Sequence, residues 1–214
     1  MLRSHIRPSV HAASLVVLLA AFAAVSAFSS MAVAQQPPVR VRGEIVKVDG
    51  NKLFVKSRDG TELIVNVPDN VAVSGVVKIP LSDVKPGSYI GISAMPEPDG
   101  SQNALHIHIF PEAMRGVAEG HGPWDVRPGA TMTNATVAEI AAVGEGRTLV
   151  VKYKDGDKKI VVPADTPIVT YVPGTRDELK PGAKIFIIAA PRQADGSLSG
   201  ARISVGRDGL TPPM

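Results

Sequence analysis

The sequence predicts an all-β protein whose mature part consists of two tandem, small, five-stranded β-barrels joined by an ordered segment rich in glycine and proline. Three observations predict this fold class. Apolar and polar residues alternate along several short stretches, which is the periodicity of β-strands. Asp-Gly pairs between these stretches are typical of tight hairpin turns. One series of motifs occurs twice in the chain, which predicts one unit in two copies.

The first 34 residues have the pattern of a cleavable export signal. Arg3 and Arg7 form a basic start, and the stretch 15–25 is entirely apolar. The small residues Ala-Val-Ala at 32–34 fit the cleavage site of a signal peptidase. We therefore expect cleavage after Ala34, a periplasmic mature protein and no membrane span after cleavage. An uncleaved membrane anchor over 12–34 is the alternative, because that stretch is long enough to cross a bilayer.

Charge and cysteine content narrow the function classes. The whole chain has 23 basic and 20 acidic residues and no cysteine. The signal contains two of the basic residues, so the mature part has 21 basic against 20 acidic side chains. With few aromatic residues and no basic stripe, the electrostatic footprint of a nucleic-acid-binding protein is missing. The lack of cysteine excludes disulfides, thiol catalysis and thiolate metal sites.

The two expected copies cover residues 38–110 and 134–207. Leu-Phe-Val-Lys at 53–56 recurs as Leu-Val-Val-Lys at 149–152. Further matches at the same spacing are Asp-Gly at 59–60 and 155–156, and Lys-Pro-Gly at 85–87 and 180–182. Because the offset stays at 95 or 96 residues, we interpret the pattern as an internal repeat. A disordered tail is expected over 208–214.

Each copy is expected to contain three strands, an irregular stretch and two further strands. In the first copy the first strand changes its phase after Ile45, which predicts a β-bulge. Asp-Gly turns lead to strands around 53–56 and 63–67, and the last two strands cover 89–95 and 103–110. This order is that of an oligonucleotide/oligosaccharide-binding (OB) barrel. A β-sandwich is the alternative, because strand order cannot be read from a strand count.

The turns carry a resemblance to known proteins. Arg-Gly-Glu-Ile-Val-Lys-Val at 42–48 and Ser-Asp-Val-Lys-Pro-Gly at 82–87 form one pattern, and Asp-Glu-Leu-Lys-Pro-Gly at 177–182 repeats part of it. This pattern resembles a family of bacterial secreted OB-like domains of unknown function, here in tandem copies. The resemblance covers nearly all of the mature chain and implies an envelope location and a β-barrel fold. Because its motifs are structural turns, it implies no catalytic residues.

The two copies differ most where the first one ends. His106, His108 and Phe110 share one side of its last strand, where the second copy has other residues. The connecting segment 111–133 has no counterpart in the repeat and contains the only tryptophan, Trp124. A tryptophan in such a loop normally packs on other groups, so we expect the segment to be ordered. The candidate ligand-binding residues are Phe110, Glu112, Arg115 and Trp124.

A metal site is a second hypothesis for the same region. His106 and His108, expected on an exposed strand face, could converge on one ion, and His121 could fold back to meet them. Glu112 or Met114 would assist. Imidazole with carboxylate suits zinc or copper(II), and imidazole with methionine suits copper(I). Solvated or stacked histidines, and a methionine packed under the loop, are the alternatives.

No catalytic motif stands out in the sequence, so we expect no enzyme. A serine-hydrolase elbow, a phosphate-binding loop and a His-Glu-x-x-His motif are all missing. The lysines of 152–159 are interpreted as a charged strand edge, with an anionic envelope ligand as the functional variant. The main hypothesis is an exported, periplasmic, non-enzymatic binding or interaction module for an envelope ligand or protein. The alternative is a periplasmic copper- or zinc-binding protein using His106, His108 and His121.

Overall fold

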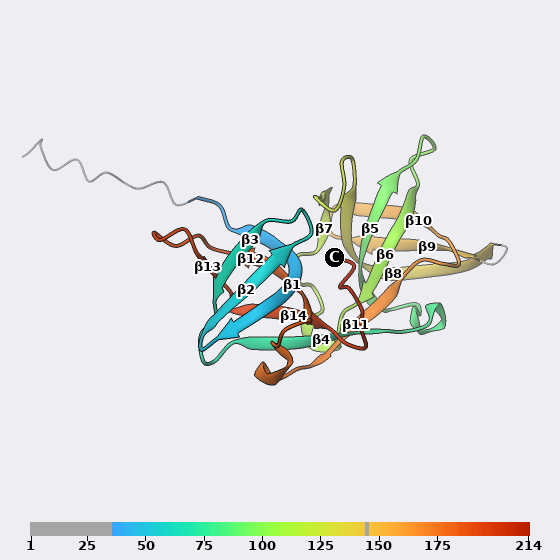
Figure 1. Ribbon diagram of the computed structural model, residues 1–214. Coiled ribbons are helices and arrows are strands. Elements are labelled where there is room, and N and C mark those ends of the chain that lie inside the picture. Colours follow the sequence, from blue (N-terminus) through green and yellow to red (C-terminus); the bar gives the residue numbers. More distant parts are fainter. Residues whose placement is uncertain (1–35, 144–145) are drawn as a thin grey trace, which may run out of the picture. The chain divides into compact units, whose positions relative to one another are not determined.

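The computed structural model describes residues 36–143 and 146–214, and the regular structure of these residues is β-strand apart from three short 3₁₀ helices (Figure 1). The expected all-β class is thereby confirmed. The expected export signal over 1–34, with its cleavage site, lies outside the described residues. Pro37–Met214 form one compact unit. In the part of the chain that the structure describes, no helix has the length and apolar character needed to cross a membrane.

The elements follow the chain in a simple order. The strands are β1 (Val39–Asp49), β2 (Lys52–Ser57), β3 (Glu62–Asn66), β4 (Ala72–Lys78), β5 (Tyr89–Pro96), β6 (Gln102–Ile109), β7 (Gly120–Pro123), β8 (Thr131–Val143), β9 (Gly146–Tyr153), β10 (Gly156–Val162), β11 (Ile168–Pro173), β12 (Lys184–Ala190), β13 (Leu198–Ser199) and β14 (Arg202–Gly206). The 3₁₀ helices are η1 (Leu81–Asp83), η2 (Glu112–Met114) and η3 (Arg176–Glu178).

Five strands form a closed barrel. β10 pairs with β9, β9 with β8, β8 with β5 and β5 with β6, and a parallel pairing of β6 with β10 closes the ring. We call this ring the closed barrel. Its interior is filled by fully buried aliphatic side chains contributed by β5, β6, β8, β9 and β10, among them Ile90, Ile92, Ile107, Val137, Leu149 and Ile160.

Beyond the closed barrel the same sheet continues through β11 and β4 to six further strands in the order β14-β12-β1-β2-β3-β13, which we call the second sheet. β13 and β14 lie at the two ends of this order and are nearly consecutive in the chain, so the chain itself joins them, and β14 also pairs in parallel with β4. The second sheet has an aliphatic core of its own, which includes Val41, Ile45, Leu53, Val65, Ile185, Ile187 and Ile203.

Both sheets take strands from both expected copies, and this differs from the expectation of one barrel within 38–110 and another within 134–207. β5 and β6 of the first copy complete the barrel begun by β8 to β10 of the second copy. In the same way, β12 to β14 of the second copy pair with β1 to β3 of the first. The last strands of each expected copy therefore pair with strands of the other, and we call this arrangement the strand exchange.

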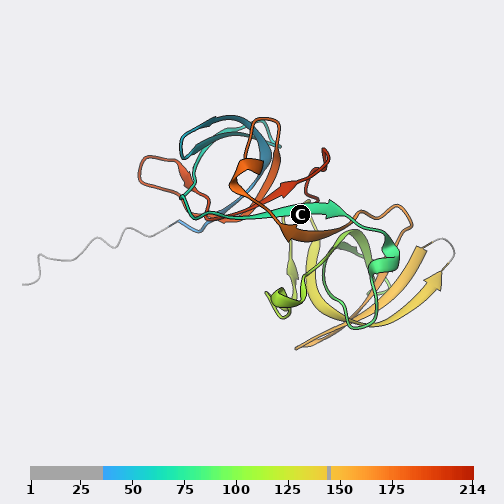
Figure 2. The same cartoon turned by 90° about the horizontal axis from the view of Figure 1, so that it is seen from below.

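The exchange has a local physical cause. The stretches before η1 and η3, expected to be irregular, form the extended strands β4 and β11, which pair antiparallel with each other (Figure 2). At about 3.3 Å per residue, β4 carries the chain about 20 Å away from the strands that precede it. Ile79, directly after β4, already packs on the core of the closed barrel. Leu179, shortly after β11, packs on the core of the second sheet.

The expected bulge in the first strand is present. The register of β1 against β2 shifts between Ile45 and Lys47, and β8 against β9 shows the same shift between Val137 and Glu139. The bulge in β1 puts Ile45 into the core while Val46 is half exposed. The strand can thus bend around the core of the second sheet.

Residues 208–214 are folded back on the protein, where a disordered tail was expected. Asp208 and Gly209 have positive φ angles of 51° and 75° and reverse the chain after β14. The Met214 side chain is only 2% exposed and packs with Val76, Val169 and Phe186. The expectation was wrong because burial of these apolar side chains outweighs the low structural propensity of a Pro-Pro segment.

Candidate functional site

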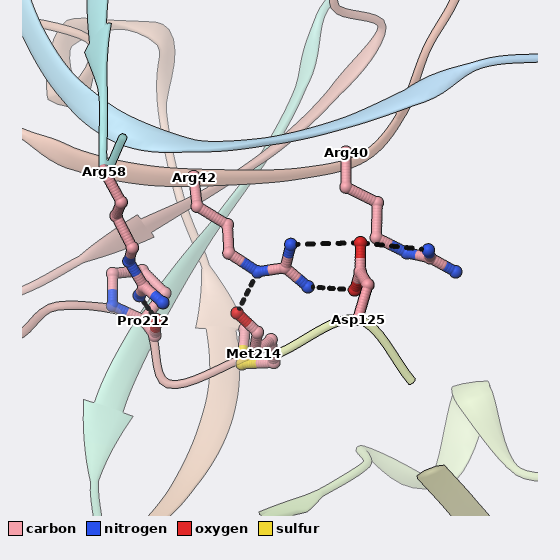
Figure 3. A network of polar contacts seen from close by, with 6 residues as sticks. All are labelled: Arg40, Arg42, Arg58, Asp125, Pro212 and Met214. Atoms are coloured by element: carbon pink, nitrogen blue, oxygen red, sulfur yellow. Dashed lines mark hydrogen bonds and ion pairs between the residues drawn. The ribbon is translucent and has the colours of Figure 1, made fainter. Parts of the chain in front are cut away.

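The candidate site begins with the outward side of β1. The alternation of the strand directs Val41 into the core of the second sheet, and Arg40 and Arg42 to the opposite side. Arg58, which follows β2, lies next to Arg42, because its main-chain N–H donates to the Arg42 carbonyl at 2.9 Å. Figure 3 shows the three guanidinium groups in a row. The hairpin of β1 and β2 therefore presents three cationic side chains together.

One carboxylate of the connecting segment, that of Asp125, pairs with two of these three cations, Arg40 and Arg42. Arg42 binds Asp125 in bidentate fashion, with its two terminal nitrogens 2.7 and 3.3 Å from the carboxylate oxygens. Arg40 lies 3.2 Å from the same carboxylate. Partial burial alone would raise the pKa of Asp125, but hydrogen bonds and charge from Arg42 and Arg40 outweigh it and lower the pKa. The carboxylate is thus held in its charged form.

Trp124 stacks on the same arginines. The Arg40 guanidinium carbon lies 4.2 Å from the centre of the indole ring, and that of Arg42 lies 5.7 Å from it. The main-chain N–H of Trp124 donates to the Ala130 carbonyl at 2.8 Å and closes a loop over 123–131 that borders a shallow hollow of about 460 Å³. The cation–π contacts position Trp124, which packs on other groups as expected for a tryptophan in this segment.

The chain's own residues 210–214 lie along these side chains. The Arg42 Nε donates to the Met214 carbonyl at 2.7 Å, and a terminal nitrogen of Arg58 donates to the Pro212 carbonyl at 2.6 Å (Figure 3). Both bonds reach main-chain oxygens. We call this surface the arginine groove; it consists of Arg40, Arg42, Arg58, Trp124 and Asp125, with residues 210–214 lying in it.

The groove has more positive than negative charge. Its three guanidinium groups lie beside one acidic side chain, that of Asp125, and burial together with the charge of Arg42 lowers the pKa of Arg58. Next to it is a hollow of about 400 Å³ that is bordered by Arg58, Lys56, Lys184, Glu44 and Thr211. A ligand that offers oxygen atoms would relieve this concentration of positive charge.

His106 and His108 are buried, whereas an exposed strand face was expected for them. They are 2% and 4% exposed, and their rings stack with centroids 5.9 Å apart. Burial lowers the pKa of His108 to about 4. The pKa of His106 is lowered to about 3, mainly by burial and further by His108 and by the charges of Arg42 and Arg58. The expectation was wrong because the outer face of β6 is covered within the fold.

Several polar atoms around this histidine pair have no partner in the structure. They are His106 Nε2, His108 Nδ1, Ser93 Oγ and Asn134 Oδ1. Neighbouring strands bring them together, because Ser93 pairs with His106 and Gly91 pairs with both His108 and Asn134. A buried site with several polar atoms suits ordered water.

The structure does not bring His121 to this pair. His121 Nδ1 lies 2.8 Å from Thr133 Oγ1, and its ring stacks on Tyr153. Thr133 and Asn134 are consecutive on β8 and point to opposite faces, so His121 and His108 lie on different sides of that strand. Within residues 36–143 and 146–214, no group of three His, Cys, Asp or Glu side chains could hold a metal ion.

The other expected site residues lie apart from the arginine groove. Glu112 and Arg115 form an exposed ion pair at 2.6 Å, and Arg115 also donates to the Gly87 carbonyl. Phe110 is buried in an aromatic cluster with Tyr89, His108 and Tyr171, so it supports the fold rather than offering a surface. Met114 in η2 is half-buried. Of the expected ligand-binding set, only Trp124 belongs to the groove.

Sequence reasoning missed the arginines and the role of residues 210–214. Arg40 and Arg42 alternate with Val39 and Val41, which reads as an ordinary polar strand face. Neither a protein family model, nor a curated protein, nor a solved structure matches this chain. The resemblance to secreted OB-like domains therefore stays a prediction.

Proposed function

We propose that this chain is an exported, non-enzymatic binding or interaction module, and that the arginine groove is its ligand site. The single observation that carries this proposal is that Arg42 and Arg58 donate to oxygens of a segment lying across them while Trp124 stacks alongside. Side chains in this arrangement hold an extended ligand that offers a series of oxygen acceptors. The chemistry is that of recognition, because the groove contains no nucleophile paired with a base.

The fold proposed for this module is a pair of OB-like barrels that exchange strands. In the closed barrel the order β8-β9-β10-β6-β5 places three meander strands beside two strands from another part of the chain. The second sheet has the equivalent order β1-β2-β3, then β13, which continues along the chain into β14, and then β12. Small barrels of this type bind ligands through one face and its adjoining loops. Trp124 and Asp125 would supply that loop here.

The excess of cationic groups supports an acceptor-rich ligand over a metal ion. Arg42 and Arg58 lie close enough to His106 for their charges to lower its pKa, and a metal cation would meet the same repulsion. An oxygen-rich ligand would instead pair with the guanidinium groups, above all with Arg40, whose side chain is 36% exposed. We therefore favour the binding module over the copper- or zinc-binding alternative.

The test is a titration of the full mature chain with two acceptor-rich probes, tripolyphosphate and oligogalacturonate. Trp124 is the only tryptophan, so its fluorescence reports on the groove directly. We expect a saturable change in emission that is lost in Arg40→Ala/Arg42→Ala. Lys47→Ala is the matched control, because Lys47 is an exposed cation on the same strand outside the groove. No saturable change, or equal affinity in the double variant, would count against the proposal.

A further inference from the structure

We infer that the ligand of the arginine groove is an extended, proline-containing polypeptide segment, and that residues 210–214 occupy the groove as a built-in substitute for it. The inference rests on the proposed function and names the ligand class. The segment reads Leu-Thr-Pro-Pro-Met. Proline fixes φ near −65° and disfavours helix in the residue before it, so Pro212 and Pro213 keep the segment extended.

The polar contacts of this segment are independent of its sequence. Arg58 binds the carbonyl of Pro212, and Arg42 binds the carbonyl of Met214. Every polypeptide offers these oxygens, and in an extended proline-rich segment they are not used up by internal hydrogen bonds. The two arginines would therefore hold any extended peptide that lies in the same direction.

Selectivity would come from the apolar side chains under the groove, Val76, Val169 and Phe186, which we call the apolar floor. The Met214 side chain is buried with Val76, Val169 and Phe186, and Leu210, Trp124 and Tyr171 pack around them. Grooves lined by aromatic side chains recognise proline-rich segments because the extended conformation is already formed before binding. We therefore expect the groove to prefer an apolar residue after Pro-Pro.

The same chain segment also explains how the site would be regulated. While Pro212 and Met214 are buried in the groove, an incoming peptide cannot reach Arg58 or the apolar floor. Thr211, directly before Pro212, is exposed and borders the hollow of about 400 Å³ next to the groove. Release of residues 210–214 would thus open the site, and a partner peptide would take their place.

The experiment uses the full mature chain with Met214→Asp, which puts a charge into the apolar floor and should release the segment. Trp124 emission should then shift to longer wavelength, and a blocked Leu-Thr-Pro-Pro-Met peptide added in trans should reverse the shift. Thr211→Asp is the matched control, because the side chain at 211 is exposed and the segment should stay in place. Pro212→Gly/Pro213→Gly is a second release variant without a buried charge.

We expect the peptide to bind both release variants, a Leu-Thr-Pro-Pro-Asp peptide to bind neither, and Arg58→Ala in the Met214→Asp background to weaken binding about tenfold. Absence of peptide binding to folded release variants would overturn the inference, as would equal binding after Arg58→Ala. If tripolyphosphate still binds with arginine dependence in that case, the proposed function stands and only the ligand class is wrong. If neither probe binds, both fail.

Discussion

Acidification should destabilise this protein through its two buried histidines. The folded-state pKa values of His106 and His108 are about 3 and about 4, and the value of an unfolded histidine is about 6.5. Both groups are therefore neutral in the folded protein, and unfolding lets them take up protons. Their contribution to stability is fully present above pH 6.5 and is lost as the pH falls from there towards 4.

The size of the effect follows from these values. Between pH 7 and pH 5, proton uptake by one unfolded histidine lowers the free energy of unfolding by about 2 kcal/mol, so the pair should cost about 4 kcal/mol. That is a large part of the 5–15 kcal/mol typical of a folded domain. Most carboxylates remain ionised in both states at pH 5, so they contribute little in this window.

Urea unfolding followed by Trp124 fluorescence at pH 7, 6 and 5 measures this loss. The double variant His106→Leu/His108→Phe should keep a nearly constant midpoint over the same range. His121→Gln should keep most of the wild-type pH dependence, because His121 is far more exposed than the pair, although burial lowers its pKa as well. A wild-type midpoint that stays constant, or a double variant with the same pH dependence as the wild type, would refute the reasoning.

Two further predictions concern the same region. Gly91→Ala should lower the free energy of unfolding by about 1–3 kcal/mol, because a Cβ at this position would overlap the His108 ring. Gly122→Ala should have little effect, because its Cβ would meet open space. The midpoints of urea unfolding measure both changes. Copper, zinc or nickel should leave the melting temperature unchanged; a rise that His106→Leu abolishes would instead support the metal-binding alternative.

Local features of the fold could be predicted from the sequence because they depend on neighbouring residues. The alternation around Ile45 predicted the bulge, and it is present where β1 meets β2. The Asp-Gly turns at 49–50 and 59–60 were predicted as hairpins, and both glycines have the positive φ angles that such turns favour. These features need no knowledge of the rest of the chain.

Partner choice among the strands could not be predicted. If the chain contains two copies of one unit, the last strands of either copy fit the first three strands of both. Which of these pairings forms depends on whether the stretches before η1 and η3 fold back or stay extended. They stay extended, as the strands β4 and β11. The burial of His106 and His108 was missed for the same reason, because a strand's surroundings depend on distant partners.

The arginine groove was missed for a related reason. Arg42 and Asp125 are 83 positions apart in the chain, and Arg42 and Met214 are 172 apart. Composition marked Trp124 as unusual, but nothing near it in sequence indicates the arginines on which it stacks. Residues 210–214 read as part of a disordered, proline-containing tail until their partners are known.

The central claim is that the two halves of the chain exchange strands and so bring the arginine groove together. Because the chain has no cysteine, introduced pairs can test it directly. Asn103 lies opposite Val161, and Asn66 lies opposite Ser199. One barrel per copy would instead pair Asn66 with Asn103 and Val161 with Ser199. We predict that Asn103→Cys/Val161→Cys cross-links on oxidation and that Asn66→Cys/Asn103→Cys does not; the opposite pattern would contradict the strand exchange.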